Sequence, residues 1–160
     1  MATYTYSPSG AVTAAKRVVV KDAFVQDAEV VVEVDQPAGT ILSDVICRFI
    51  GNVTIGSAGD VGFEIGTSSS GNQIAKNVDG FLDNGTTIAA NSVFFCLKGL
   101  GGANSVVADA ADTPNDHTAA AAAGGYTDSD RTIYFTTITA NQTVTGDNEI
   151  ELNFVFTHLN

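Results

Sequence analysis

Apolar and polar positions alternate with a period of two along most of this chain, the pattern of β-strands that bury one face. The clearest case is the last segment, whose apolar positions are Ile150, Leu152, Phe154 and Phe156. The intervening positions are mostly polar, and they include Glu149, Glu151 and Asn153. We therefore expect Phe154 and Phe156 in the core, and Glu151 on the opposite face as a side chain that tolerates substitution by alanine.

Similar segments recur, and they predict strands near residues 16–24, 30–34, 43–55, 61–65, 92–98, 131–139 and 149–157. The segment at 92–98 is apolar on both sides, which predicts a strand buried on both faces. Gly, Asn, Asp and Pro residues separate the segments and indicate turns. Short strands without a long helical period predict an all-β fold, an antiparallel β-sandwich or jelly roll.

A region without strand pattern, residues 99–130, is rich in alanine and glycine and predicts a long loop. Within it, Thr118 and Gly124 could cap a single helical turn. The length of 160 residues suits one domain. We expect an N-terminal arm over residues 1–15 and a β-sandwich domain over residues 16–160.

The charge of the chain is unevenly distributed. Eighteen acidic and seven basic side chains give a formal net charge of -11. Up to residue 24, however, three bases (Lys16, Arg17 and Lys21) face one acid, for a local charge of +2. The remaining 17 acids and four bases give -13. The acidic side chains after residue 24 would repel phosphate groups, which argues against nucleic-acid binding. Only the N-terminal segment is suited to an acidic partner.

That N-terminal segment is the candidate binding site. Tyr4 and Tyr6 lie just before the bases and could act as amphipathic anchors beside Lys16, Arg17 and Lys21. The alternative is a frayed terminus before an edge strand. The start of the chain has no signal-peptide pattern, and no apolar run is long enough to cross a membrane.

Residues for catalysis are scarce, and we expect no enzyme. The two histidines, His117 and His158, lie far apart, and no nucleophile elbow or phosphate-binding motif is present. We expect no cofactor and no metal site, since the aspartates match no calcium loop. Cys47 and Cys96 could form a disulfide, but two buried free thiols fit a reducing site of synthesis better.

Two segments resemble small β-rich structural proteins of tailed bacteriophage virions. These are residues 61–72, VGFEIGTSSSGN, and residues 143–157, TVTGDNEIELNFVFT. The resemblance implies a capsid decoration, or cement, protein: a homotrimer made in the host cytoplasm that binds the major capsid protein on the outer capsid surface. The alternative is a tail or fibre module that recognises host glycans, for which Tyr126 and Tyr134 are the candidate stacking residues.

Overall fold

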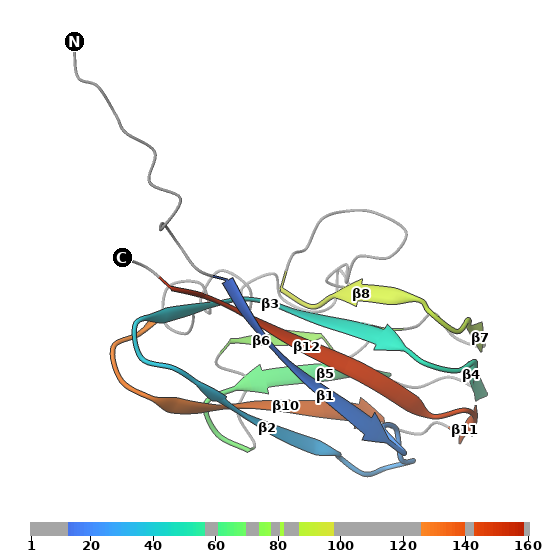
Figure 1. The fold of residues 1–160 in the computed structure, drawn as a ribbon. Helices are drawn as coiled ribbons and strands as arrows, with labels where there is room; N and C mark the ends of the chain where they lie inside the picture. Colours follow the sequence, from blue (N-terminus) through green and yellow to red (C-terminus); the bar gives the residue numbers. More distant parts are fainter. Residues whose placement is uncertain are drawn as a thin grey trace.

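The computed structural model describes residues 13–56, 61–69, 74–77, 81, 87–97, 126–139 and 143–158. These residues form an all-β, sandwich-like domain of twelve strands that pair antiparallel throughout (Figure 1). Within these ranges no helix is long and apolar enough to span a membrane. The predicted arm residues Tyr4 and Tyr6, His117 and the expected helical turn at 118–124 lie outside the described residues.

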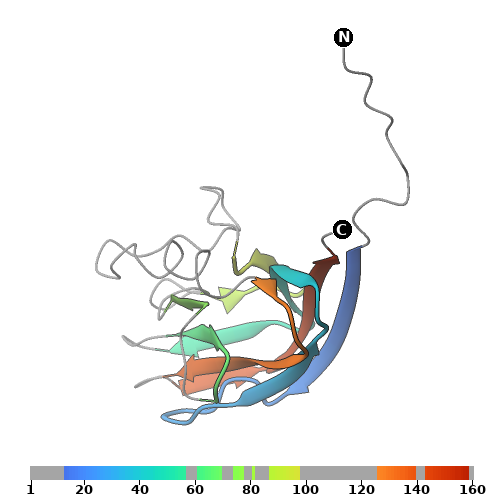
Figure 2. The same cartoon turned by 90° about the vertical axis from the view of Figure 1, so that its left-hand side faces the viewer.

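Two sheets form the sandwich (Figure 2). The five-stranded sheet has the order β1-β12-β3-β8, with β9 also pairing with β3. Its strands are β1 (Thr13–Lys21), β12 (Glu149–His158), β3 (Thr40–Phe49), β8 (Val93–Phe95) and β9 (Tyr126–Thr127). The four-stranded sheet has the order β2-β10-β5-β6. Its strands are β2 (Val31–Gln36), β10 (Arg131–Thr139), β5 (Val61–Gly66) and β6 (Ala75–Asn77).

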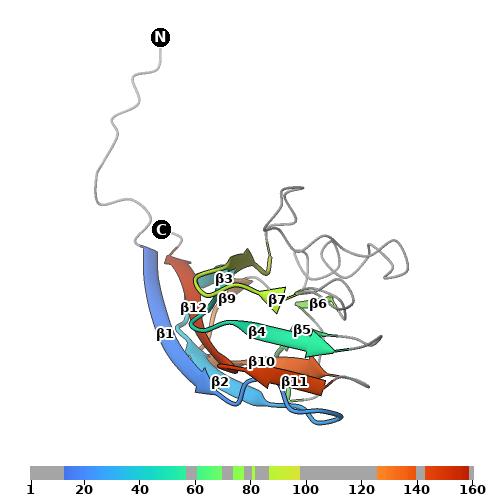
Figure 3. The same ribbon diagram turned by 90° about the vertical axis from the view of Figure 1, so that its right-hand side faces the viewer.

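A small third sheet continues the five-stranded sheet beyond a bend (Figure 3). It contains β11 (Thr143–Gly146), β4 (Val53–Gly56) and β7 (Thr87–Ile88), which adjoin β12, β3 and β8 in the chain and keep their order. Glycines permit the bend, because a Cβ on Gly51 would collide with Asp147. Gly146 has a φ of +100°, and its Cβ would collide with the carbonyl of Asn52.

Phenylalanine rings fill the space between the sheets. Phe135 on β10 meets Phe154 on β12 edge to face, with ring centroids 6.4 Å apart. Phe81 joins Phe49 on β3 to Phe63 on β5, at centroid distances of 5.6 and 5.3 Å. These contacts bury the inward-facing residues of both sheets in one core.

Several sequence predictions are thereby confirmed, among them the all-β fold and the inward orientation of Phe154 and Phe156. The jelly-roll connectivity stays a prediction. The apolar run at 43–55 is two strands, β3 and β4, divided at the bend. The prediction of a strand buried on both faces at 92–98 is wrong: β8 is a three-residue strand at the edge of the described sheet, and Phe95 is 38% exposed.

The expected boundaries shift at two places. Strand β1 begins at Thr13, so the last three residues assigned to the arm belong to the sheet. Strand β9 forms within the region expected to be a loop, where it pairs with the beginning of β3. A two-residue strand is too short for a periodic pattern to reveal.

Candidate functional site

The three bases of the candidate binding site all lie on β1, which forms one edge of the five-stranded sheet. The alternation of β1 divides them between the two faces. Arg17 and Lys21 face outward with the register partners Asn153 and Glu149, whereas Lys16 faces the second sheet. The Nζ of Lys16 donates a hydrogen bond of 2.6 Å to the backbone carbonyl of Asp35 on β2. Lys16 therefore closes the side of the sandwich and is not part of the outer face.

Arg17 belongs to a network of charged side chains on the outer face. Its Nη2 lies 2.5 Å from Oε2 of Glu151, and Nη2 of Arg48 on β3 lies 3.1 Å from the same oxygen. Asn153 donates to the other oxygen of Glu151 at 3.1 Å, and Arg48 also donates to Asn91 at 2.8 Å. These hydrogen bonds, from Arg48 first and then Arg17 and Asn153, lower the pKa of Glu151 to about 2.

This network revises the expectation for Glu151. The residue does lie on the outer face, but its side chain is only 12% exposed. Loss of this carboxylate would leave the guanidinium groups of Arg17 and Arg48 without their shared acceptor. We therefore expect substitution by alanine to be destabilising, which unfolding measurements would test.

Apolar side chains lie beside this network. Ile46 on β3 pairs with Phe95 on β8, and Ile41 on β3 pairs with Tyr126 on β9. Phe95 is 38% exposed and Tyr126 is 52% exposed, while Ile41 and Ile46 are half-buried. The outer face of an antiparallel sheet is normally polar, so these exposed apolar and aromatic groups make this face the candidate contact surface.

We call this surface the five-strand face. It is defined by the outward side chains Arg17, Val19, Lys21, Ile41, Ile46, Arg48, Phe95, Tyr126, Glu149, Glu151, Asn153 and Val155. It carries three bases and two acids. Aromatic, arginine and aliphatic residues with little net charge are the composition of a protein–protein interface core.

The outer face of the four-stranded sheet has the opposite character. Glu33 and Asp35 are exposed on β2, where they alternate with buried valines. Glu64 on β5 also faces outward, and Nζ of Lys76 lies 2.5 Å from its Oε1. Three acids against one base make this face acidic, which suits a surface exposed to water.

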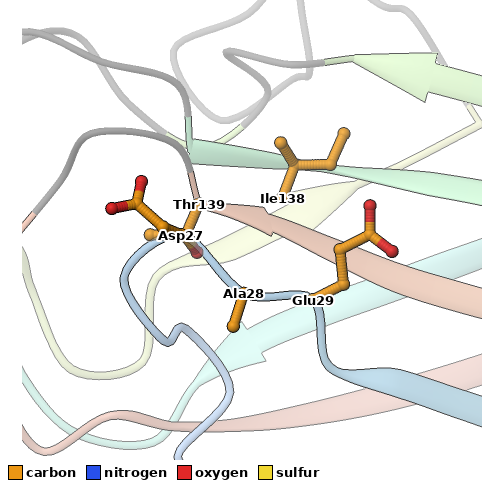
Figure 4. Close-up of a pocket in the computed structure, with 5 residues that line it drawn as sticks. All are labelled: Asp27, Ala28, Glu29, Ile138 and Thr139. Carbon is orange, nitrogen blue, oxygen red and sulfur yellow. The ribbon is translucent and has the colours of Figure 1, made fainter.

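A shallow hollow lies at one end of the four-stranded sheet, lined by Asp27, Ala28, Glu29, Ile138 and Thr139. Figure 4 shows the carboxylates of Asp27 and Glu29 pointing away from each other, on opposite sides of Ala28. Cation binding needs oxygens that converge on one point. The hollow therefore lacks a convergent set of ligands, and the described residues contain no group of three metal-ligating side chains.

The two thiols are buried and are not joined in a disulfide, as the sequence favoured. Burial raises the pKa of Cys47 and of Cys96 well above the ordinary value. Both therefore stay protonated, which disfavours nucleophilic chemistry at either sulfur. His158 lies at the end of β12, and the other histidine lies outside the described residues.

The sequence found only part of this face. It identified Arg17 and Lys21 through the local charge, but it missed Ile46, Arg48 and Phe95. The alternation within β3 places Ile46 and Arg48 on one side, and this pattern could have identified them if the limits of the strand had been known.

Comparison with family models, curated proteins and solved structures found no match.

Proposed function

We propose that this chain is a non-enzymatic virion structural protein, a capsid decoration or cement protein that binds the outer surface of a phage capsid and stabilises the particle. Its partners are the major capsid protein and other copies of itself, in a homotrimer. It is synthesised in the host cytoplasm and resides on the capsid surface. The proposal starts from the resemblance of residues 61–72 and 143–157 to virion proteins.

The five-strand face is the observation that carries the proposal. It combines exposed Phe95 and Tyr126 with the network of Arg17, Glu151 and Arg48 on a rigid five-stranded sheet. Such a surface matches a protein partner better than a small ligand, since it is broad and has little net charge. The acidic opposite face would then point to solvent.

A capsid-binding assay tests this assignment. We would incubate the chain with purified capsids that lack it, sediment the particles and measure the bound protein. Phe95→Glu places a charge among the exposed apolar groups of the five-strand face and is expected to weaken binding by about tenfold or more. Thr143→Glu makes the same charge change at an exposed position of the small sheet and should leave binding intact.

Two results would refute the attachment surface. One is equal binding by the two variants, and the other is an absence of binding by the unmodified chain. Phe95 is exposed, so Phe95→Glu should keep the fold, which far-UV circular dichroism would verify.

The alternative function is a glycan-binding module of a tail or fibre. The exposed ring of Tyr126 favours it, since sugar rings stack on accessible aromatic side chains. Tyr134 is half-buried on the outer face of the four-stranded sheet, away from Tyr126. Binding on a glycan array that is lost with Tyr126→Ala would support this function over the first.

A further inference from the structure

Strands β1 and β2 are the end strands of their two sheets, and they lie side by side at the same edge of the sandwich (Figures 1 and 3). Among the described residues, β1 pairs only with β12 and β2 only with β10. In the part of the chain that the structure describes, each strand therefore keeps one side of its backbone without a neighbouring strand. Such edges are templates for the addition of another strand.

Exposed valines flank this edge, with Val19 on the outer side of β1 beside Glu151 and Val31 on the outer side of β2. Of the five large apolar side chains exposed in the described residues, three lie here: Val19 on β1, Val25 in the connection and Val31 on β2. Their exposed fractions are 39%, 42% and 40%. We call the surface formed by these valines and the two strands the β1–β2 edge.

The two strands of this edge carry opposite charges. Strand β1 has three bases and no acid, whereas β2 has Glu33 and Asp35 and no base. Two β1 strands from different copies would place like charges together, which is unfavourable. By contrast, β1 of one copy against β2 of the next would join opposite charges.

A cleft opens between the two strands. It is lined by Lys16 from β1, by residues 35–37 at the end of β2 and by residues 130–132 at the start of β10. Within one copy, the Lys16 side chain reaches across to β2, where it donates to the carbonyl of Asp35. Strands β1 and β2 are therefore close together without being paired in one sheet.

We infer that copies of this chain associate side by side through the β1–β2 edge, with β1 of one copy against β2 of the next and the exposed valines at the margins of the contact. Each copy offers β1 to one neighbour and β2 to the other, so the contact is heterologous and closes into a ring when the rotation permits. The inference relies on the proposed function only for the number of copies, which is three.

A competing explanation gives the bases another role. Lysines on an edge strand commonly prevent unwanted strand pairing. If that is their role here, the chain is a monomer, and removal of the bases promotes association. The two explanations therefore predict opposite effects of the same substitutions.

The test measures molar mass by light scattering over a range of protein concentrations. The isolated chain is expected to have three times its mass of 16.5 kDa. Lys21→Glu and Glu33→Lys alone should each raise the concentration needed for half-assembly by about tenfold or more. The double variant Lys21→Glu/Glu33→Lys exchanges the charges and should restore assembly.

Asp128→Lys is the matched control, because it reverses an exposed acid in the turn after β9. It should leave the mass unchanged. A monomeric unmodified chain, or single variants that assemble as well as the control, would overturn the inference. The result is independent of capsid binding: a trimer that fails to bind capsids refutes the proposed function alone, and a monomer that binds them refutes this contact alone.

Discussion

Phe154 offers the sharpest test of how the two sheets are held together. Its side chain is fully buried, and its ring meets Phe135 of the opposite sheet at 6.4 Å. Phe154→Ala removes the ring and leaves a cavity, which costs about 3–5 kcal/mol. Against a total stability of about 5–15 kcal/mol, this is a large fraction. For a domain of this size, each kcal/mol lowers the melting temperature by about 2–4 °C, so we expect a fall of about 6–20 °C.

The matched control is the next residue. Val155 faces outward on the same strand and is only half-buried, so Val155→Ala should cost under about 1 kcal/mol. Urea unfolding followed by far-UV circular dichroism is the suitable assay, because the chain has no tryptophan to report by fluorescence. All samples should have the same protein concentration, since assembly adds to apparent stability. Equal losses for the two variants would refute the assignment of an inner and an outer face to β12.

Further predictions concern an acid, two glycines and the thiols. The pKa of Glu151 is lowered to about 2, so its contribution to stability is present above its ordinary pKa of about 4.3 and is lost as the pH falls toward 2. Melting temperatures should therefore fall more steeply for the unmodified chain than for Glu151→Gln over that range, and parallel curves would contradict the network. Gly39 has a φ of +74° with open space around it, so Gly39→Ala should cost about 1–2 kcal/mol in urea unfolding. Gly146→Ala adds a collision with backbone and should cost more, and the reverse order would contradict the bend. Cys47 and Cys96 should react with a thiol reagent only after unfolding, and rapid labelling of the folded chain would contradict their burial.

The fold was largely predictable because each long strand carries its own pattern. In β12 Ile150, Leu152, Phe154 and Phe156 alternate with outward positions, and all four reach the core. The pattern fails where a strand is short or irregular. Strand β8 is apolar at every position although it lies at a sheet edge with Phe95 exposed, and the sequence alone cannot separate that case from a strand buried on both faces.

The candidate surface was harder to predict, since it depends on which strands become neighbours. The charge pattern identified Arg17, but nothing local shows that residues 134 positions apart, Arg17 and Glu151, meet. Nor does it show that Arg48 joins them from a third strand. Register sets these contacts, and register follows from the pairing of the whole sheet.

The central claim concerns where this chain acts, and a reconstruction of the intact particle tests it most directly. Our account predicts density for the β-sandwich on the outer capsid surface in groups of three. The five-strand face, with Phe95 and Arg48, should contact the shell, and the β1–β2 edges should meet within each group. Density in the tail, or a sandwich whose acidic four-stranded face contacts the shell, would contradict the account.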